Sequence, residues 1–287
     1  MKRNYSLILI LMFALGLWGC AERSEARPVG TGLFSWKAQA FQEGRGKELL
    51  EWMAERDISA LYQAISGDEE KDIIQEFLRN AADRKIAVYL LTGDPEWGMD
   101  PSGKPMIEAV ERAAEYNEGL PEGIGLRGVL MDTEPYLTRG WDDDPSSVME
   151  SYADAMTRAN ETARQKGLEY IACIPYFYDN LGQEETLERL VREGCGGLAV
   201  MNYHKNDEVG QIENEVALAR KYDRPITVIY ELQPPGTHDL TEANTYYNDG
   251  IAAVDESWRA LMEAFGPNGL SRAIHEFEAA KEVWTLE

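Results

Sequence analysis

Two carboxylates stand two residues apart at the end of an apolar run, in the stretch GVLMDTEPY that begins at Gly128. Asp132 and Glu134 follow four small or apolar residues, and Pro135 comes directly after them. A carboxylate at the end of a buried strand loses hydration, and the charge of one carboxylate raises the pKa of its neighbour. Such a pair can divide the acid and base steps of a reaction between two side chains.

The elements that must position this pair follow a simple alternation. Short apolar runs predict strands, and between them residues with apolar spacing of three and four predict helices, such as 69–85, 146–167 and 208–222, with stops at Gly167 and Pro225. The eight predicted strands are 32–36, 58–62, 86–91, 127–132, 169–174, 197–203, 225–231 and 270–275.

This pattern predicts an α/β protein with one (β/α)8 TIM-barrel domain over residues 31–287. The alternative, an open doubly wound sheet, lacks the Gly-rich turn after its first strand. In a barrel, functional groups gather at the carboxyl ends of the strands. Asp132 and Glu134 share a side with Leu130, because strand side chains alternate. We therefore expect the carboxylates at the mouth of the barrel.

Other strand ends bring acidic and aromatic residues to the same rim. Aromatic rings stack on the apolar faces of sugars, and carboxylates act on hydroxyls and on the glycosidic oxygen. Aromatic residues of loops also serve local packing, so the composition alone leaves both roles open. The candidate binding residues are Trp36, Asp94, Trp97, Tyr136, Tyr176, Tyr178, Asn202, His204 and His275.

Two short segments resemble the motifs of family 18 glycoside hydrolases. GVLMDTE, at 128–134, is similar to the strand-four motif DGxDxDxE in its Gly and its final Asp-x-Glu, and MNY, at 201–203, is similar to the sixth-strand motif Met-x-Tyr-Asp. The resemblance implies that Glu134 protonates the leaving oxygen. It implies that Asp132 orients the N-acetyl group of the substrate, whose carbonyl acts as nucleophile, and that Tyr203 hydrogen-bonds that group.

The same segments depart from the family pattern. Arg127 and Leu130 stand where the family has carboxylates, and His204 replaces the sixth-strand Asp. The chain is also similar to a poorly characterised group of bacterial barrel lipoproteins with an Asp-x-Glu-Pro strand four and a closing Ile-His, here 274–275. That second resemblance implies no particular substrate.

A second catalytic scheme is open. TEP, at 133–135, resembles the Asn-Glu-Pro of retaining glycosidases with the acid/base on strand four and the nucleophile on strand seven. This resemblance implies Glu134 as acid/base and Glu231 as nucleophile, a scheme that needs carboxyl groups about 5–5.5 Å apart. The alternative role for Glu231 is that of an ion-paired rim residue.

Two other classes of function compete with hydrolysis of a glycan. Leu130 and His204 favour a carbohydrate-binding barrel without catalysis. A metal-dependent hydrolase would use His204, His238 or His275, but these histidines form none of the metal-binding spacings. We therefore expect no metal and no cofactor.

The N-terminus predicts export. Lys2 and Arg3 precede an apolar run, and LWGC, at 17–20, resembles a bacterial lipobox. We expect residues 1–19 to be a lipoprotein signal peptide, Cys20 to carry the lipid and 20–30 to be a tether. The protein would then be secreted and lipid-anchored at the bacterial cell envelope. Ordinary secretion is the alternative.

Charge and the remaining cysteines limit the partners. The chain has 28 basic and 51 acidic side chains, a net charge of −23, which argues against nucleic acid and anionic headgroups as ligands. A carbohydrate is the expected partner, and the membrane is expected to be contacted only through the lipid on Cys20. Cys173 and Cys195 are expected to be buried free thiols, although a disulfide is allowed in that compartment.

Overall fold

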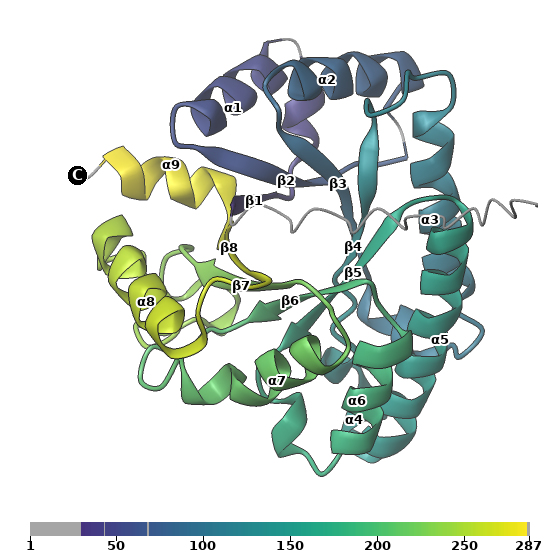
Figure 1. Cartoon of the computed structure of the whole chain (residues 1–287), viewed down its shortest axis with the longest axis vertical. Coiled ribbons are helices and arrows are strands. Elements are labelled where there is room, and N and C mark those ends of the chain that lie inside the picture. Colours follow the sequence, from purple (N-terminus) through teal and green to yellow (C-terminus); the bar gives the residue numbers. More distant parts are fainter. Residues whose placement is uncertain (1–29, 43, 68, 286–287) are drawn as a thin grey trace, which may run out of the picture.

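Eight parallel strands close into a barrel in the computed structural model, which describes residues 30–285 apart from 43 and 68 (Figure 1). Each strand pairs with the next in the sequence, and β8 pairs with β1. The predicted TIM barrel is confirmed. The strands are β1 Thr31–Ser35, β2 Ile58–Ala64, β3 Ala87–Thr92, β4 Leu126–Met131, β5 Glu169–Pro175, β6 Gly197–Met201, β7 Ile226–Glu231 and β8 Leu270–His275.

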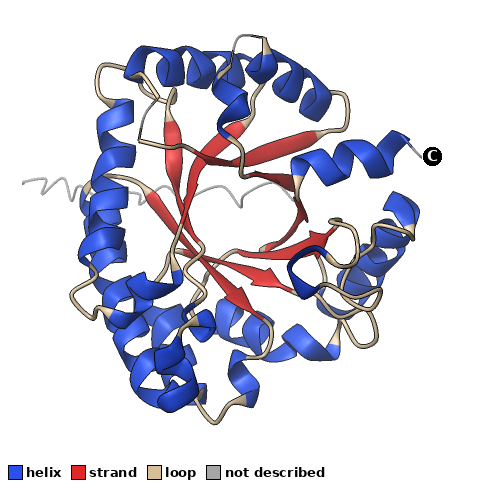
Figure 2. Cartoon of the chain, turned by 180° about the vertical axis from the view of Figure 1, so that it is seen from behind, coloured by secondary structure: helices blue, strands red, loops and turns tan. Residues whose placement is uncertain are grey.

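Helices surround the ring of strands (Figure 2). The α-helices are α1 Arg45–Ala54, α2 Lys71–Asp83, α3 Lys104–Asn117, α4 Arg139–Asp143, α5 Pro145–Gln165, α6 Glu184–Glu193, α7 Glu213–Lys221, α8 Gly250–Phe265 and α9 Phe277–Thr285. Short 3-10 turns occupy η1 Ala38–Phe41, η2 Pro95–Met99, η3 Pro135–Leu137, η4 Tyr178–Asn180, η5 Gly210–Ile212 and η6 Thr237–Asp239.

The predicted boundaries differ from the structure where strands leave the barrel. The strands predicted over 127–132 and 197–203 end at Met131 and Met201, so Asp132 and Tyr203 lie just beyond regular pairing. The helix predicted from 208 begins as the 3-10 turn η5 at Gly210, whose N–H donates a hydrogen bond to Asp207 Oδ1, and continues as α7 from Glu213. Gly167 ends α5 as predicted, with a φ of +70°.

The barrel interior and the layer between strands and helices form two separate apolar cores. Leu130 is 0 % exposed and belongs to the inner core, which places the start of the GVLMDTEPY segment inside the barrel as predicted. Inner side chains of this kind fill a small barrel and leave no channel through it. The inner core consists of Phe34, Tyr62, Tyr89, Leu91, Leu130, Ile171, Cys173, Ala199, Met201, Ile229 and Ala273.

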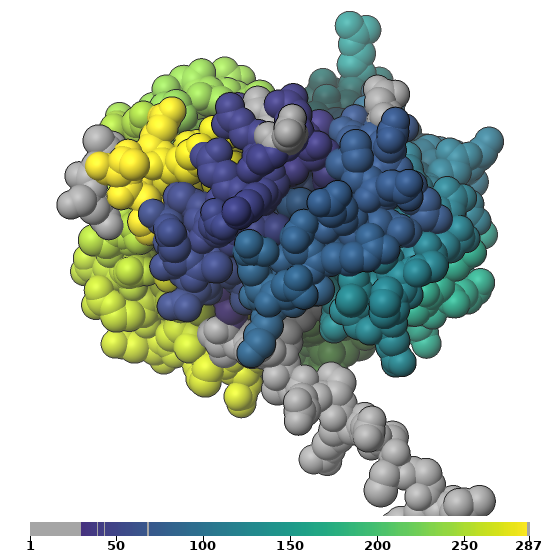
Figure 3. Space-filling model, turned by 90° about the horizontal axis from the view of Figure 1, so that it is seen from above, coloured from purple at the N-terminus to yellow at the C-terminus, as the bar shows by residue number. Residues whose placement is uncertain are grey.

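The two ends of the described chain pack together. Lys281 of α9 forms an ion pair of 3.0 Å with Glu48 of α1, and the ring centroid of Trp284 lies 5.3 Å from that of Trp52. Figure 3 shows the yellow C-terminal segment beside the purple N-terminal one. Within residues 30–285, no helix is long and apolar enough to cross a membrane. The predicted signal peptide, Cys20 and most of the predicted tether lie outside the described residues.

Candidate functional site

A tight turn, rather than the pleat of a strand, positions the two carboxylates. Asp132 N donates a hydrogen bond of 2.8 Å to Thr92 O, which continues the β3–β4 pairing by one residue. Thr133 is then fully buried, and Glu134 adopts left-handed backbone angles, φ 49° and ψ 53°. At Gly93 an added Cβ would lie 1.8 Å from Asp132 O, so this approach of the two backbones requires glycine.

Asp132 stands in an environment that favours its neutral form. Its Oδ1 is buried and accepts no hydrogen bond within the described part of the chain, and the Cys173 thiol of β5 is its neighbour across the β4–β5 register, which pairs Met131 with Ala172. Burial, followed by the charge of Glu134, raises the pKa of Asp132 to about 7. The pair therefore retains a proton up to near-neutral pH, as acid catalysis requires.

Glu134 is held by a cluster of aromatic rings. The Tyr136 hydroxyl donates a short hydrogen bond to Glu134 Oε2. Burial, and then the charge of Glu134, raise the pKa of Tyr136, so this hydroxyl keeps its proton and remains a donor. The Tyr136 ring packs edge-on against Phe177, Tyr178 and Trp141, with centroids 5.2, 6.2 and 6.4 Å away. Residues that follow β4 and β5 thus hold the Glu134 carboxylate in place together.

Glu231 and His275 form a buried pair on the opposite side of the rim. Glu231 is 3 % exposed; its Oε1 accepts a hydrogen bond of 2.7 Å from the Gln233 N–H, and its Oε2 lies 2.8 Å from His275 Nδ1. Trp36 Nε1 donates to His275 Nε2 at 2.9 Å. Because an indole only donates, Nε2 must be the acceptor and Nδ1 carries the ring proton.

Tyr203 lies between the two groups of carboxylates. Its ring centroid is 6.3 Å from that of His275, and its backbone carbonyl accepts a hydrogen bond of 2.7 Å from Asn244 Nδ2. Burial, then the charge of Glu231, raise the pKa of the Tyr203 hydroxyl, with smaller contributions from Asp132 and Glu134. The Tyr203 hydroxyl therefore keeps its proton and can donate a hydrogen bond.

The other predicted binding residues fall into three sets by exposure: buried, exposed and partly buried. Tyr178 and Asn202 are 1 % and 3 % exposed, and Asn202 Nδ2 donates to Glu208 O at 2.9 Å. Both side chains are therefore buried packing residues of the rim. Asp94 is exposed and caps η2 by accepting from the Glu96 N–H at 2.9 Å. Trp97, Tyr176 and His204 are partly buried at strand exits. Contact of any of these residues with a substrate stays a prediction.

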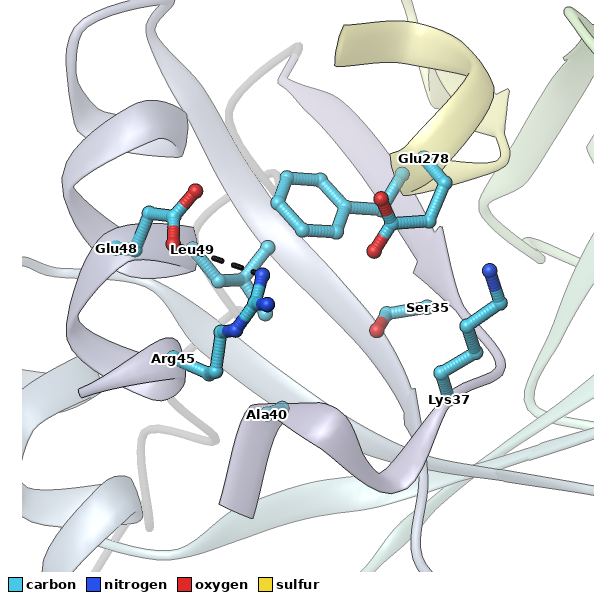
Figure 4. Close-up of a pocket in the computed structure, with 8 residues that line it drawn as sticks. Ser35, Lys37, Ala40, Arg45, Glu48, Leu49 and Glu278 are labelled. Carbon is cyan, nitrogen blue, oxygen red and sulfur yellow. Dashed lines mark ion pairs between the residues drawn. The ribbon is translucent and has the colours of Figure 1, made fainter. Parts of the chain in front are cut away.

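A hollow of about 210 Å³ opens at the ends of β1, β2 and β3. Its wall reaches the backbone of Asp132 through Thr92 and Gly93. A second hollow, between β1, α1 and α9, has room for about 20 Å³, enough for a single water, although Lys37, Arg45 and Glu48 line it (Figure 4). The larger hollow is lined by Trp36, Ala38, Ala64, Ile65, Ser66, Leu91, Thr92 and Gly93.

Two residues of the site were missed from the sequence. Cys173, predicted only as a buried thiol, is the neighbour of Asp132 across the β4–β5 register, and that register would have identified it, because Met131 pairs with Ala172. Trp141 stacks on Tyr178 with centroids 5.8 Å apart. Both Cys173 and Cys195 are buried and free, as predicted. Over the described residues, no group of three or more His, Cys, Asp or Glu side chains could hold a metal ion.

Solved structures with the same barrel carry out several kinds of chemistry. Similar chains include the C-terminal domain of a putative chitinase from Desulfitobacterium hafniense, at 10 % identity over 91 % of this chain and 97 % of that one, with a TM-score of 0.58. A GH18 chitinase from Pseudoalteromonas aurantia matches at 10 % identity over 89 % and 99 %, with a TM-score of 0.56. An AP endonuclease, family 2, from Brucella melitensis matches at 14 % identity over 90 % and 98 %, with a TM-score of 0.53.

At these identities the similarity establishes the fold alone, and the chitinases share it with an endonuclease. No family model matches the sequence, and no curated protein matches it. The function must therefore be argued from the site.

Proposed function

We propose that the protein is a glycoside hydrolase that cleaves N-acetylated glycans at the rim formed by β4, β6 and β7. The observation that carries this proposal is the Asp132–Glu134 pair, which retains a proton near neutral pH and whose charges help to raise the pKa of the Tyr203 hydroxyl. The structural similarity to GH18 chitinases makes a glycoside hydrolase a consistent conclusion for this barrel.

In the proposed reaction, the proton that the Asp132–Glu134 pair retains passes to Glu134 and from there to the glycosidic oxygen, while the bond from that oxygen to the anomeric carbon breaks. The Tyr136 hydroxyl occupies Oε2, so Oε1 transfers the proton. Asp132 orients the acetamido N–H of the sugar, and the acetamido oxygen forms a bond to the anomeric carbon. Tyr203 donates to the same group. Water, deprotonated by Glu134, then attacks the anomeric carbon, and the bond between that carbon and the acetamido oxygen breaks.

Glu231 is less suited to act as nucleophile. Both of its oxygens are hydrogen-bonded, one to Gln233 N–H and one to His275, and the side chain is buried. Attack on a sugar would require a carboxylate oxygen facing the substrate. Substrate assistance needs no such oxygen from β7.

The test is hydrolysis of chitotetraose, a tetramer of N-acetylglucosamine, compared with its de-N-acetylated counterpart. We expect cleavage of the acetylated tetramer only, and a loss of about 10²–10⁴-fold in kcat for Glu134→Gln. Glu96→Gln, an exposed carboxylate at the neighbouring β3 exit, is the matched control and should retain activity. Equal cleavage by wild type and Glu134→Gln would overturn the assignment, and equal cleavage of both tetramers would overturn substrate assistance.

A second candidate is a carbohydrate-binding barrel without catalysis. Leu130 is fully buried where the family has a carboxylate, and the neighbour of Asp132 across the β4–β5 register is the Cys173 thiol, a weak donor, instead of a carboxylate. Calorimetric binding of chitotetraose with no product formed after prolonged incubation would favour this reading over hydrolysis.

We further propose that the protein acts at the cell envelope, anchored through a lipid on Cys20. The motive is the lipobox-like LWGC at 17–20. Expression with Cys20→Ser should move the protein from the membrane fraction to the soluble fraction, and a labelled fatty acid should be incorporated into the wild type alone. Equal fractionation of the two proteins would contradict the anchor.

A further inference from the structure

Glu231, His275 and Trp36 form one hydrogen-bonded chain across the ends of β7, β8 and β1. We propose that Glu231 and His275 are positioning residues that hold the Trp36 indole as one wall of a sugar-binding hollow beside Asp132. This inference rests on the proposed action on glycans, and it gives Glu231 a role other than nucleophile.

The hydrogen bonds that join Trp36, His275 and Glu231 all run in one donor-to-acceptor direction. Glu231 and His275 are opposite each other in the β7–β8 register, and the Glu231 side chain is 3 % exposed. The carboxylate accepts from His275 Nδ1 at 2.8 Å, which leaves Nε2 as the acceptor for Trp36 Nε1 at 2.9 Å. The buried end is anchored a second time by the Gln233 N–H at 2.7 Å. The Glu231–His275 pair therefore orients the Trp36 ring, and Trp36 is 38 % exposed.

The hollow that Trp36 borders has the chemistry of a neutral, ring-shaped ligand. Apart from Trp36, its lining is formed by small or aliphatic residues with two hydroxyls, Ser66 and Thr92, and contains no charged side chain. An indole face with nearby hydroxyls suits a pyranose, which presents an apolar face and hydrogen-bonding edges. The volume of about 210 Å³ is below that of drug-sized sites, about 300–1,000 Å³, and suits one small unit of a larger ligand.

The hollow is continuous with the proposed catalytic pair. Thr92 O accepts from the Asp132 N–H at 2.8 Å, and Gly93 lies against the Asp132 carbonyl. A glycan whose reacting unit is at Asp132 and Glu134 would place a neighbouring unit in the hollow, against Trp36. The two proposals therefore describe adjoining parts of one binding surface.

The arrangement predicts a dependence on pH. Burial, the largest single effect, lowers the pKa of His275, but the charge of Glu231, its hydrogen bond to the imidazole and the charges of Asp132 and Glu276 together raise the pKa above its ordinary value of 6.5. As the pH falls through that pKa, Nε2 gains a proton and can no longer accept from Trp36. The groups that face the imidazole are Glu231, Asp132, Glu276, Tyr203, Phe34 and Trp36.

The first experiment tests the chain of hydrogen bonds without any substrate. In a pH titration of the whole protein followed by NMR, the indole Nε1–H signal that disappears in Trp36→Phe should shift with a midpoint above 6.5. In Glu231→Gln the midpoint should fall from its wild-type value, because burial is then opposed by fewer charges. An indole signal without this midpoint, or a midpoint equal in wild type and Glu231→Gln, would overturn the positioning role.

The second experiment tests the hollow with chitotetraose as the probe, in the Glu134→Gln background so that no turnover occurs. Addition of the probe should shift the Trp36 indole signal, and affinity should fall about 2- to 10-fold between pH 8.5 and pH 5.5, as expected for loss of one hydrogen bond. Trp36→Phe, which keeps a ring and loses the donor, should bind more weakly and lose this pH dependence. Unchanged pH dependence in Trp36→Phe would overturn the inference.

Outcomes for the two proposals are separable. If chitotetraose shifts the Trp36 indole signal but is never cleaved by the unmodified protein, the proposed sugar-binding hollow is supported and the proposed hydrolase activity is overturned. If chitotetraose is cleaved through Glu134 but leaves the Trp36 indole signal unchanged, the proposed hydrolase activity is supported and the proposed sugar-binding hollow is overturned. Glu231→Gln separates them as well, because a positioning residue changes KM and the pH profile, whereas a nucleophile abolishes kcat at every pH.

Discussion

Cys173 of β5 lies opposite Asp132 inside the mouth of the barrel, since the β4–β5 register pairs Met131 with Ala172. Cys173 belongs to the inner core, and its own pKa is raised by burial and then by the charge of Asp132, so the thiol keeps its proton. A residue of β5 thereby stabilises the charged form of a carboxyl group at the end of β4.

Removal of that thiol should raise the pKa of Asp132 above 7, because the neighbouring Cys173 lowers it. The measurement is a titration of the Asp132 carboxyl by carbon NMR in Cys173→Ala. Cys195→Ala is the matched control, since Cys195 is equally buried and its thiol hydrogen-bonds the Val191 carbonyl instead. The same midpoint in both variants would show that the thiol has no influence.

Asp132→Asn should stabilise the protein in a defined range of pH. The pKa of Asp132 is raised from 3.8 to about 7, so the folded state is favoured fully below 3.8 and loses stability as the pH rises through 7. The gain in free energy of unfolding from Asp132→Asn should therefore grow between pH 4 and 7 and then level off. Denaturant unfolding across this range measures it, with exposed Asp142→Asn as control. A gain that is constant with pH would contradict the buried charge.

Tyr136→Phe should impair the proposed acid while leaving the fold intact. The variant loses the hydroxyl that hydrogen-bonds Glu134 Oε2 but keeps the ring that packs on Phe177. Because hydrogen bonds to charged groups contribute about 1.5–3 kcal/mol, we expect a loss of about tenfold or more in kcat on chitotetraose. Tyr176→Phe, a partly buried tyrosine of the next strand exit, should have a smaller effect. Equal losses would argue against a specific role for Tyr136.

Gly93→Ala should disturb both the site and the fold. The new Cβ would meet the Asp132 carbonyl carbon at 2.3 Å, and backbone atoms cannot rotate away. We expect a destabilisation of about 1–3 kcal/mol or more, measured by denaturant unfolding. Gly67→Ala is the matched control, because an added Cβ there has nothing within 4 Å. Similar stabilities of the two variants would refute the close approach at Gly93.

Much of the barrel could be predicted from local patterns. Apolar runs and helical spacing locate all eight strands to within two residues, because each pattern depends on the side chains of its own segment. The exits were predicted less well. The turn at Glu134 and the late start of α7 involve backbone angles and hydrogen bonds specific to those turns, which periodicity does not describe.

The sequence by itself determined the strand order of the barrel and the arrival of Asp132, Glu134, Tyr203 and Glu231 at its rim, since strand polarity brings all strand ends to one face. Only the tertiary structure decided the partners. Cys173 lies beside Asp132, and His275 separates Glu231 from Trp36, because register and closure of the ring bring together side chains that are far apart in the chain. Contacts between such distant residues set the protonation state of each titratable side chain, and the local sequence pattern cannot predict them.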